Sequence, residues 1–476
     1  MRLTIPNPLG PPLTFDTSNF SHLSDTLSAS LPSGWHRRPH VRLLSLFLVV
    51  LLVFAWRPAP PFPPSWKSEY GAERALPQLN GVERYGEGRE GRYVRFDVPV
   101  ETGFNHQLQR ILLHHHLAVL GNRSLAFDPV VIDDTWFSFR IFGWPWRSAK
   151  IPLSAFVATT ISGFEAFYQA PRAVPSPYYS SVCPSWRQRT YTLKTDSTPD
   201  GELELPADGQ ARLHQLQVLL AGSDDGCIRI QGEVFDDSFF DSHGPLDLLE
   251  TFVTSPVMKH FAFSPTVLSI LNRAIPSLAP ESSLYDLSRD SRMWSSSPGR
   301  MSGWKHILAM HLRRGADWED VCDEKGHRAA PFVGFNKYAP LPGNENVPTP
   351  PETVEATRMG LYRAKCLPQV LDIIARARRM RKNHPLLRSI YLLTDAHGPW
   401  LDEVRMWLES EGWDHVWVGR EDIYPRWRER EVGVAVDMEV ARRAGVFVGN
   451  GFSTTTSNIV VLRQRDGLHP DLTQFW

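Results

Sequence analysis

The feature that most constrains the fold is a regular alternation of short apolar runs and longer helical patterns in the C-terminal third of the chain. Apolar strands separated by helices predict a parallel β-sheet that is covered by helices on both faces. Such sheets bind their ligands beyond the carboxyl ends of the strands. Strands are expected at Ile307 to Leu312, Ile390 to Thr394, Val416 to Val418 and Val446 to Val448. Helices are expected from about Glu352 to Arg381, Leu401 to Glu411, Val432 to Arg443 and from Thr454 onward.

A second α/β unit is indicated earlier in the chain. Residues Tyr93 to Val98 alternate in polarity as a strand does, and Gly103 then opens a helix expected from about Asn105 to Leu120. A strand, a glycine turn and a helix are the start of a βαβ unit. The stretch from Cys183 to about Leu248 is otherwise rich in loop residues. Further elements are expected at Leu125 to Ile132, at Cys227 to Phe235 as a strand, and at Leu246 to Thr251 and Pro265 to Ile275 as helices.

The length of the chain predicts two folded domains, because 476 residues exceed the usual size of one hydrophobic core. Residues 91–300 form the expected first domain and residues 301–476 the second, with the polar, serine-rich stretch from Pro276 to Gly303 as the crossing. The net charge of -1 provides no overall attraction to polyanions. Nucleic acid is therefore not an expected partner.

One apolar segment, Leu43 to Trp56, precedes both domains. At about 1.5 Å per residue it reaches about 21 Å, which is short for a hydrocarbon core of roughly 30 Å. Arginines precede it and a proline-rich run follows, so a single signal anchor with its basic side in the cytosol is expected. Residues 1–42 are then a tail without regular structure, 43–56 the membrane anchor and 57–90 the stem. A cleaved signal peptide is the alternative, but the leader is long and no small-residue cleavage site follows.

This orientation predicts a single-pass type II membrane protein of the endoplasmic reticulum or Golgi, with everything from Arg57 in the lumen. Two sequons test the prediction. Asn122, in Asn122-Arg123-Ser124, is expected to be glycosylated, whereas Asn19 is expected to be cytosolic and bare. The opposite topology would instead indicate a membrane adaptor that faces the cytosol.

The cysteines also point to an oxidising compartment. The chain has four, all on the lumenal side of the apolar segment, and none stands in a CxxC or another metal-binding spacing. An even number in an oxidising lumen is expected to pair, and the order along the chain favours Cys183 with Cys227 and Cys322 with Cys366. Four free buried thiols are the alternative.

A candidate anion site follows the strand that ends at Leu312. His311 and Arg313 fall at its carboxyl end, where α/β folds place ligands. A guanidinium has five fixed donors and keeps its charge at any working pH, which suits a phosphate or a nucleoside diphosphate. A lone strand-end arginine is also common as a structural residue, so its neighbours decide its role.

The turn that follows Val448 is the second half of this candidate site. It runs Gly449-Asn450-Gly451-Phe452-Ser453-Thr454-Thr455-Thr456 and joins a buried strand to a helix. Glycines permit close approach of the backbone, hydroxyls cap the helix, and the first-turn N–H groups favour a negative ligand. Asp395 and Asp437, at ends of neighbouring elements, are candidates to accept hydrogen bonds from a guanine edge or a ribose hydroxyl. Helix caps are the alternative role for such carboxylates.

Three ordered motifs together resemble the GDP-fucose protein O-fucosyltransferase family. The segment from His311 to Cys322, HLRRGADWEDVC, resembles the HxRxGxDW segment of that family. The stretch from Gly103 to Gln107, with Asn122 to Ala126 after the helix, is similar to the donor-site entrance and the NRT-like stretch of the family. The segments Tyr391 to Asp395 and Asp437 to Arg463 are similar to the ATD strand and the nucleotide-binding turn.

This resemblance implies a GT-B architecture, with two Rossmann-like domains facing a cleft, and a metal-independent, inverting transfer of L-fucose. The donor implied is GDP-fucose and the acceptor a Ser or Thr hydroxyl of a secretory-pathway protein, with no cofactor. No DxD motif follows a strand, as a metal-dependent GT-A enzyme would require. Arg313 is implied to stabilise the departing GDP. The implied donor-binding residues are Asn105, His106, His311, Asp395, Asp437, Ser453, Thr454 and Thr455.

One position departs from the family pattern. The residue before the glutamine of the entrance motif is His106, where the family has asparagine, and Asn105 stands one place earlier. A histidine can donate one hydrogen bond or act as a base near neutral pH. Because the change bears on the acceptor more than on the donor, two alternatives stay open: a glycan-directed fucosyltransferase of the same fold, and an inactive donor-binding pseudoenzyme.

Overall fold

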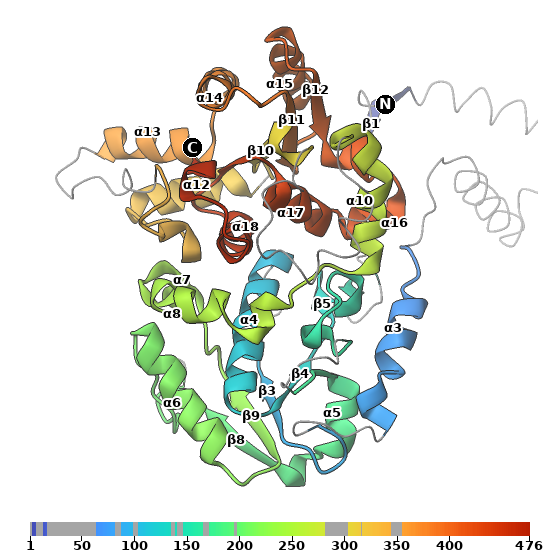
Figure 1. Cartoon of the computed structure of the whole chain (residues 1–476), viewed down its shortest axis with the longest axis vertical. Coiled ribbons are helices and arrows are strands. Elements are labelled where there is room, and N and C mark those ends of the chain that lie inside the picture. Colours follow the sequence, from blue (N-terminus) through green and yellow to red (C-terminus); the bar gives the residue numbers. More distant parts are fainter. Residues whose placement is uncertain are drawn as a thin grey trace, which may run out of the picture.

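In a computed structural model of the chain, two lobes with parallel sheets are stacked along the longest axis (Figure 1). The described residues are 63–80, 87–98, 103–134, 139, 146–164, 171–194, 198–280, 303–315, 317–343 and 355–476, together with the backbone of 2–5 and 13–16. The latter form strands β1 (Arg2–Ile5) and β2 (Leu13–Asp16), which pair antiparallel. Residues 1–42 were expected to lack regular structure, so this prediction is wrong for these two short strands.

The first lobe is built on a five-stranded sheet in the order β7-β4-β3-β9-β8. All of its strand pairs are parallel, as expected for a βαβ unit. The strands are β3 (Tyr93–Phe96), β4 (Ser124–Phe127), β7 (Val174–Pro175), β8 (Gln188–Thr192) and β9 (Cys227–Gln231), and a separate antiparallel pair is formed by β5 (Val130–Val131) and β6 (Lys150–Ile151). The helices are α3 (Lys67–Arg74), α4 (Phe104–Leu120), α5 (Ser176–Val182), α6 (Gly209–Gly222), α7 (Asp237–Asp241), α8 (Gly244–Val253), α9 (Pro256–Lys259) and α10 (Pro265–Leu278).

The second lobe also has a five-stranded parallel sheet, in the order β12-β11-β10-β13-β14. The four expected strands are confirmed, and β14 is a fifth that the alternation did not predict. The strands are β10 (Ile307–Leu312), β11 (Ser389–Thr394), β12 (His415–Val418), β13 (Val446–Gly449) and β14 (Thr473–Phe475). The helices are α12 (Trp318–His327), α13 (Glu355–Cys366), α14 (Val370–Asn383), α15 (Pro399–Ser410), α16 (Trp427–Glu431), α17 (Gly433–Arg443) and α18 (Thr454–Arg465).

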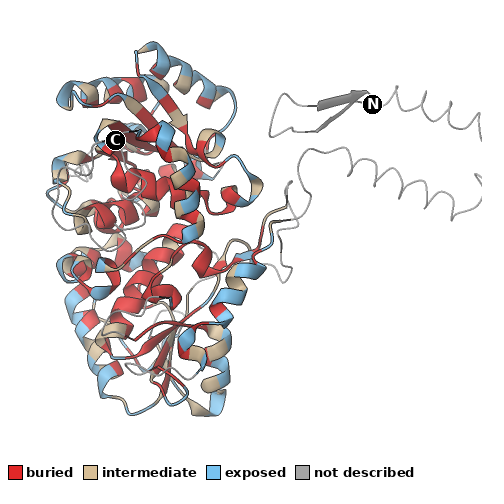
Figure 2. Ribbon diagram, turned by 45° about the vertical axis from the view of Figure 1, so that its right-hand side comes forward, coloured by how far each residue is buried: buried red, intermediate tan, exposed pale blue. Residues whose placement is uncertain are grey.

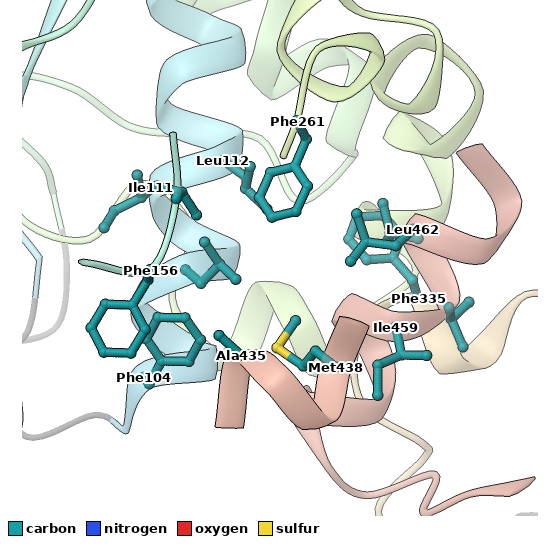
Figure 3. Packing of buried hydrophobic residues seen from close by; sticks show 14 of the residues in the cluster. Phe104, Ile111, Leu112, Phe156, Phe261, Phe335, Ala435, Met438, Ile459 and Leu462 are labelled. Carbon is teal, nitrogen blue, oxygen red and sulfur yellow. The ribbon is translucent and has the colours of Figure 1, made fainter. Parts of the chain in front are cut away.

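The two lobes share one hydrophobic core. A single cluster of buried apolar residues includes members of both sheets and of the helices between them, and buried segments continue from one lobe into the other in Figure 2. Figure 3 shows Phe104, Leu112 and Phe261 of the first lobe close to Met438 and Ile459 of the second. Because these side chains exclude water from the junction, the lobes are held together by the same force that holds each one. A second cluster, on the opposite face of the second sheet, packs α14 and α15.

Two helix predictions need correction. The long helix expected from Glu352 to Arg381 is two helices, α13 and α14, that are separated at Leu367 to Gln369. Pro368 has no backbone N–H and disfavours helical geometry before it, and the side chains of Gln369 and Asp372 then form a capping box for α14. The region from Cys183 to Leu248, expected to be mostly loop, contains the 14-residue helix α6. Asp208 caps it by accepting from the Ala211 N–H at 2.7 Å.

The expected membrane anchor at 43–56 lies outside the described residues, as does most of the proline-rich stem. Among the residues that the structure describes, no helix is both long and apolar enough to cross a membrane. The crossing between lobes, expected from Pro276 to Gly303, lies mostly outside the described ranges. The predicted domain boundary near residue 300 stays a prediction; along the chain it lies between β9 and β10.

Both expected disulfides are present. Cys183 pairs with Cys227 in the first lobe and Cys322 with Cys366 in the second, and the paired residues are separated by 44 positions in each case. No free cysteine remains. The alternative of four free thiols is therefore excluded, and paired cysteines are typical of proteins that fold in an oxidising compartment.

Candidate active site

Arg313 stands one residue beyond the carboxyl end of β10, as the strand pattern predicts. Its side chain is 36% exposed, so part of it reaches the surface. The indole of Trp318 lies 5.5 Å from the guanidinium carbon. An aromatic face at that distance attracts the cation and limits its movement.

The carboxylate of Asp395 holds both Arg313 and the backbone that follows it. Its Oδ2 lies 2.6 Å from Nη1 of Arg313, and its Oδ1 accepts from the backbone N–H of Arg314 at 2.6 Å. The contact follows from the sheet, since Leu312 pairs with Thr394 and each of the two residues stands one place further along its strand. Asp317 lies further away, 3.6 Å from Nη2 of Arg313. Asp395 thus orients the arginine, a role that the sequence did not reveal.

His311 connects the same strand to the helix that follows the turn. Its Nδ1 lies 2.9 Å from Oγ1 of Thr456, and the ring is buried. Burial, with the nearby charge of Arg313, lowers the pKa of His311 to about 3, so the ring is neutral at physiological pH. Arg313 follows β10 two positions after His311, a spacing at which extended backbone places side chains on the same side of a sheet. Arg313 consequently lies on the side of the sheet where α18 begins.

The first turn of α18 has the capped geometry that its sequence predicts. Ser453 is the N-cap, and its hydroxyl accepts from the Thr455 N–H at 3.2 Å. Ser453 and Thr454 are largely buried, while Thr455 is half-buried. Asn450 fixes the turn: its Oδ1 accepts from the Phe452 N–H, and its Nδ2 donates to the carbonyl of Cys366 at 2.8 Å. The N-terminus of a 12-residue helix therefore points toward the side of Arg313.

The first lobe contributes the start of α4 to the same place. Asn105 donates to Oγ1 of Thr455 at 2.7 Å, and Asn458 donates in return to the backbone and side-chain oxygens of Asn105 at 3.0 and 3.1 Å. One turn further on, Gln109 donates to the hydroxyl of Ser457 at 2.8 Å. The N-terminal turns of α4 and α18 thus meet across the lobe boundary, in agreement with their neighbouring ends in Figure 1.

His106, the residue that departs from the family pattern, faces this boundary. Its side chain is 37% exposed, and its Nδ1 lies 4.0 Å from Asp237. Burial lowers its pKa, Asp237 opposes that shift, and the cations Arg110, Lys325 and Arg313 add to it. Close to it, Lys325 of the second lobe lies 3.3 Å from Asp241 of α7, so the two lobes are in contact on this side. Arg110 beneath His106 is buried and paired with Asp237 at 2.9 Å.

Asp437 is placed differently from what its candidate role requires. Its carboxylate is buried in the wall of the second lobe, where it accepts from the hydroxyls of Tyr391 at 2.6 Å and Tyr424 at 2.8 Å. Burial raises its pKa to about 7, although both hydrogen bonds act in the opposite direction. Two tyrosines therefore occupy the oxygens that a guanine or ribose would need, and a nucleotide role for Asp437 stays an untested prediction that this geometry does not favour.

Two supporting contacts were not predicted from the sequence. The indole N–H of Trp476 donates to the carbonyl of His311 at 2.9 Å, and the indole N–H of Trp318 donates to the carbonyl of Cys366 at 3.2 Å. The second contact joins the Cys322–Cys366 disulfide to the ring beside Arg313. The sequence offers one signal for this second contact, because Trp318 stands four residues before Cys322 in the same helix. Cys366, which accepts the hydrogen bond, is distant in sequence.

A comparison with protein families matches most of the second lobe, together with α9 and α10. Residues 256–466 match the family model of GDP-fucose protein O-fucosyltransferases. This part of the chain is therefore a domain of that family. The chain is accordingly a GDP-fucose-dependent fucosyltransferase, a glycosyltransferase. The matched residues include Arg313, Asp395 and the turn before α18.

Solved structures of fucosyltransferases are also similar to the chain. Two crystal forms of POFUT1 in complex with GDP-fucose are 12% and 14% identical in sequence to this chain, with TM-scores of 0.48 and 0.46. The superposed parts cover 81% and 83% of this chain and 97% and 99% of the POFUT1 chains. A mutant of Arabidopsis thaliana FUT1 in complex with GDP is 11% identical in sequence, with a TM-score of 0.34. The superposed parts cover 86% of this chain and 79% of the FUT1 chain. No curated protein sequence matches the chain significantly.

Two further predictions lie outside this site. Asn122, the expected glycosylation site, follows α4 in a left-handed conformation (φ 50°) with an exposed side chain, so it is accessible. Among the described residues, no group of three or more His, Cys, Asp or Glu side chains is arranged to hold a metal ion. Glycosylation and metal-independence both stay predictions.

Proposed function

We propose that the enzyme transfers L-fucose from GDP-fucose to a Ser or Thr hydroxyl of a secretory-pathway protein, with inversion at the anomeric carbon and without a metal ion. The observation that carries the proposal is the fixed guanidinium of Arg313 at a strand end, held by Asp395 at 2.6 Å on the side where α18 begins. The complexes of similar proteins with GDP-fucose and GDP agree with this donor.

The chemistry follows from where charge develops. As the bond from the anomeric carbon to the β-phosphate oxygen breaks, the sugar becomes positive and the phosphate gains negative charge. Arg313 and the N-terminal turn of α18 stabilise that charge, because both present fixed donors that need no rearrangement. The acceptor hydroxyl attacks the opposite face of the sugar, so it arrives from the first lobe.

Asn105, His106, Ser453, Thr454 and Thr455 form the proposed rim of the donor site. Asn105 links the two helix starts and aligns them. His106 is the first-lobe residue near Arg313 that could contact the donor or the acceptor hydroxyl. His311 supports the donor site indirectly, because its buried ring pairs with Thr456 and does not reach the surface.

The proposed location is a secretory membrane, with the catalytic lobes in the lumen as a type II protein. The two disulfides support an oxidising compartment. Enzymatic deglycosylation of the protein from its native host, followed by mass measurement, tests this orientation: Asn122 should carry a glycan and Asn19 should not.

The transfer is tested with the purified lumenal part and GDP-fucose. Release of GDP should increase when a folded acceptor domain with an accessible Ser or Thr is added, and proton NMR of the product should show the anomeric configuration opposite to that of the donor. GDP binding with no GDP release for any acceptor would favour the pseudoenzyme. Release with free oligosaccharides alone would favour the glycan-directed enzyme.

A further inference from the structure

A cavity of about 440 Å³ lies in the first lobe, separate from the residues around Arg313. It is bounded by the ends of β3 and β4, by the first turns of α4 and by β5 and β6, all within the described residues. The residues that matter for its chemistry are Arg95, Phe96, Asp97, His114, Phe127 and Asp128. A volume in this range suits a small molecule, since typical ligand pockets measure roughly 300–1,000 Å³.

The position of the cavity is where this type of sheet binds ligands. β4 pairs with one edge of β3 and β9 with the other, so β3 is the central strand of this sheet. Asp97 follows the last residue of β3 and Asp128 the last residue of β4. Crevices beyond the carboxyl ends of the strands are the usual ligand sites of open α/β sheets.

The cavity lies next to the first turn of α4, which contacts the second lobe. Gln107, which lines it, follows His106 in the first turn of α4. The side chain of Gln107 donates to the carbonyl of Val131 at 2.7 Å and accepts from the Val131 N–H at 2.9 Å, which fixes one wall. A molecule that occupies this cavity therefore lies on the first-lobe side of the boundary, the side from which the acceptor hydroxyl approaches in the proposed function.

Two polar atoms around the cavity have no partner among the described residues. His114 is 2% exposed, its ring stacks on Phe96 with centroids 4.4 Å apart, and its buried Nε2 makes no hydrogen bond. The buried Nε of Arg95 is likewise without an acceptor. Burial lowers the pKa of His114 to about 3, so the imidazole is neutral at physiological pH. Buried polar atoms are normally paired, so these two indicate a hydrogen-bonding occupant.

The charged residues that line the cavity are two cations, Arg95 and Lys150, and two carboxylates, Asp97 and Asp128, so their charges balance. Arg95 lies 3.2 Å from Asp128, and Asp97 lies 3.3 Å from Arg229. Paired charges give no net attraction for an ion, yet they still present donors and acceptors to a neutral ligand. Phe96 and Phe127 add apolar surface. A hydroxyl group can both donate and accept, which suits an imidazole nitrogen in either role and a guanidinium N–H.

We propose that this cavity binds a neutral sugar ring that the acceptor carries, next to the hydroxyl that receives fucose. The inference rests on the proposed function and deepens it, because it makes the natural acceptor a glycosylated molecule. The apolar faces of the ring contact Phe96 and Phe127, and its hydroxyls pair with His114, Arg95 and the two aspartates.

The test measures sugar binding separately from donor binding. The full chain, saturated with GDP, is titrated with lactose, cellobiose and chitobiose by ligand-observed NMR, and GDP affinity is measured in parallel. His114→Phe preserves the stacked ring but removes Nε2. It should weaken binding of the preferred disaccharide at least tenfold and leave the affinity for GDP unchanged.

The matched control is His116→Phe. His116 is also buried on α4 with unpartnered ring nitrogens, but it lies against Phe252 and away from the cavity. This variant should bind disaccharides as the wild type does. A second pair of variants introduces a bulky side chain. Val98→Trp fills part of the cavity and should abolish disaccharide binding. Val218→Trp, at a position 56% exposed on α6, should leave disaccharide binding unchanged.

The possible results distinguish the proposed sugar site from the proposed transfer of fucose. If none of the disaccharides binds the wild type, or if His114→Phe and Val98→Trp bind them normally, the cavity holds only water and the inference is wrong. If sugars bind as expected but GDP-fucose is never turned over, the sugar site stands and the proposed function fails.

Discussion

Asp395 fixes Arg313 through one carboxylate oxygen and the Arg314 N–H through the other, each at 2.6 Å. A charged hydrogen-bonded pair of this geometry keeps the guanidinium in one orientation. The orientation matters because an electrostatic stabiliser works best when it is in place before charge develops. Asp395 is therefore a positioning residue for Arg313 in our account.

Replacement of Asp395 by asparagine should separate positioning from binding. Asp395→Asn retains an acceptor for the Arg314 N–H but loses the charge that holds Arg313. We expect kcat for GDP-fucose turnover to decrease about tenfold to a hundredfold, since part of the roughly 2.7–4 kcal/mol that one preorganised donor supplies is lost. KM for GDP-fucose should change much less.

The control is Asp317→Asn, because Asp317 is more exposed and lies 3.6 Å from the same guanidinium. It should change kcat by less than a factor of about three, as is usual for exposed ion pairs. Equal losses in the two variants would show that Asp395 has no special role.

The strand ends were predictable from the sequence, but this contact was not. Ile307 to Leu312 is a run of apolar residues long enough for a buried strand, and Arg313 follows it directly. The partner of Arg313 depends on β10 and β11 being neighbours in the sheet, with Leu312 opposite Thr394. Strand order is set by packing of the whole lobe, so local pattern cannot supply it.

Other differences between the predicted and the observed elements have local causes. Pro368 divides the long helix, and its chemistry was visible in the sequence but was outweighed by the helical pattern on both sides. Helix α6 was missed although Asp208 and the spacing of Leu213, Leu216 and Leu220 indicate a capped amphipathic helix. Asp437 stands at a plausible position in the chain, but its tyrosine partners come from two other elements.

The two disulfides provide a matched experiment, because both join residues 44 positions apart. Removal of either pair, by Cys→Ala at both positions, should lower the free energy of unfolding by about 2–5 kcal/mol, with similar loop-entropy contributions. Loss of Cys322–Cys366 should also weaken GDP binding, since Trp318 and Asn450 both donate to the carbonyl of Cys366. Denaturant titration and calorimetry measure the two effects.

Loss of Cys183–Cys227 should leave GDP affinity unchanged, because this pair lies in a core cluster of the first lobe. If both double variants weakened GDP binding equally, the effect would be one of general destabilisation.

The shared core predicts that the lobes unfold together. Ile459, buried on α18, packs in the cluster that also contains Leu112 of α4. Ile459→Ala should lower the free energy of unfolding by about 2–5 kcal/mol, through lost burial and a residual cavity. Fluorescence and far-UV circular dichroism should report one common transition in both proteins. Two separated transitions in the wild type would contradict a core that both lobes share.

The buried carboxyl of Asp437 predicts a pH dependence with a definite sign. Its pKa is raised from 3.8 to about 7 in the folded protein, so the folded state holds a proton that the unfolded state releases between these values. This contribution to stability is complete below about pH 4 and decreases by on the order of 4 kcal/mol as the pH rises to 7. Asp437→Asn cannot ionise and should lose this slope.

Urea titrations from pH 4 to 8 measure the slope. The stability of the wild type relative to Asp437→Asn should decrease as the pH rises and should become constant above about pH 7. A difference that is independent of pH would mean that Asp437 is ionised throughout, held by its two tyrosines.

The role of Arg313 is tested most simply by GDP-fucose turnover of the Arg313→Ala variant. Arg378→Ala is the control, because the side chain of Arg378 is 63% exposed. In the part of the chain that the structure describes, Arg378 pairs only with the surface residue Glu411. We predict that Arg313→Ala lowers kcat/KM about 100-fold to 1,000-fold while the fold and measurable GDP binding persist, and that Arg378→Ala is unchanged. Turnover by Arg313→Ala within a factor of about three of the wild type would contradict a role of this guanidinium in stabilising the departing GDP.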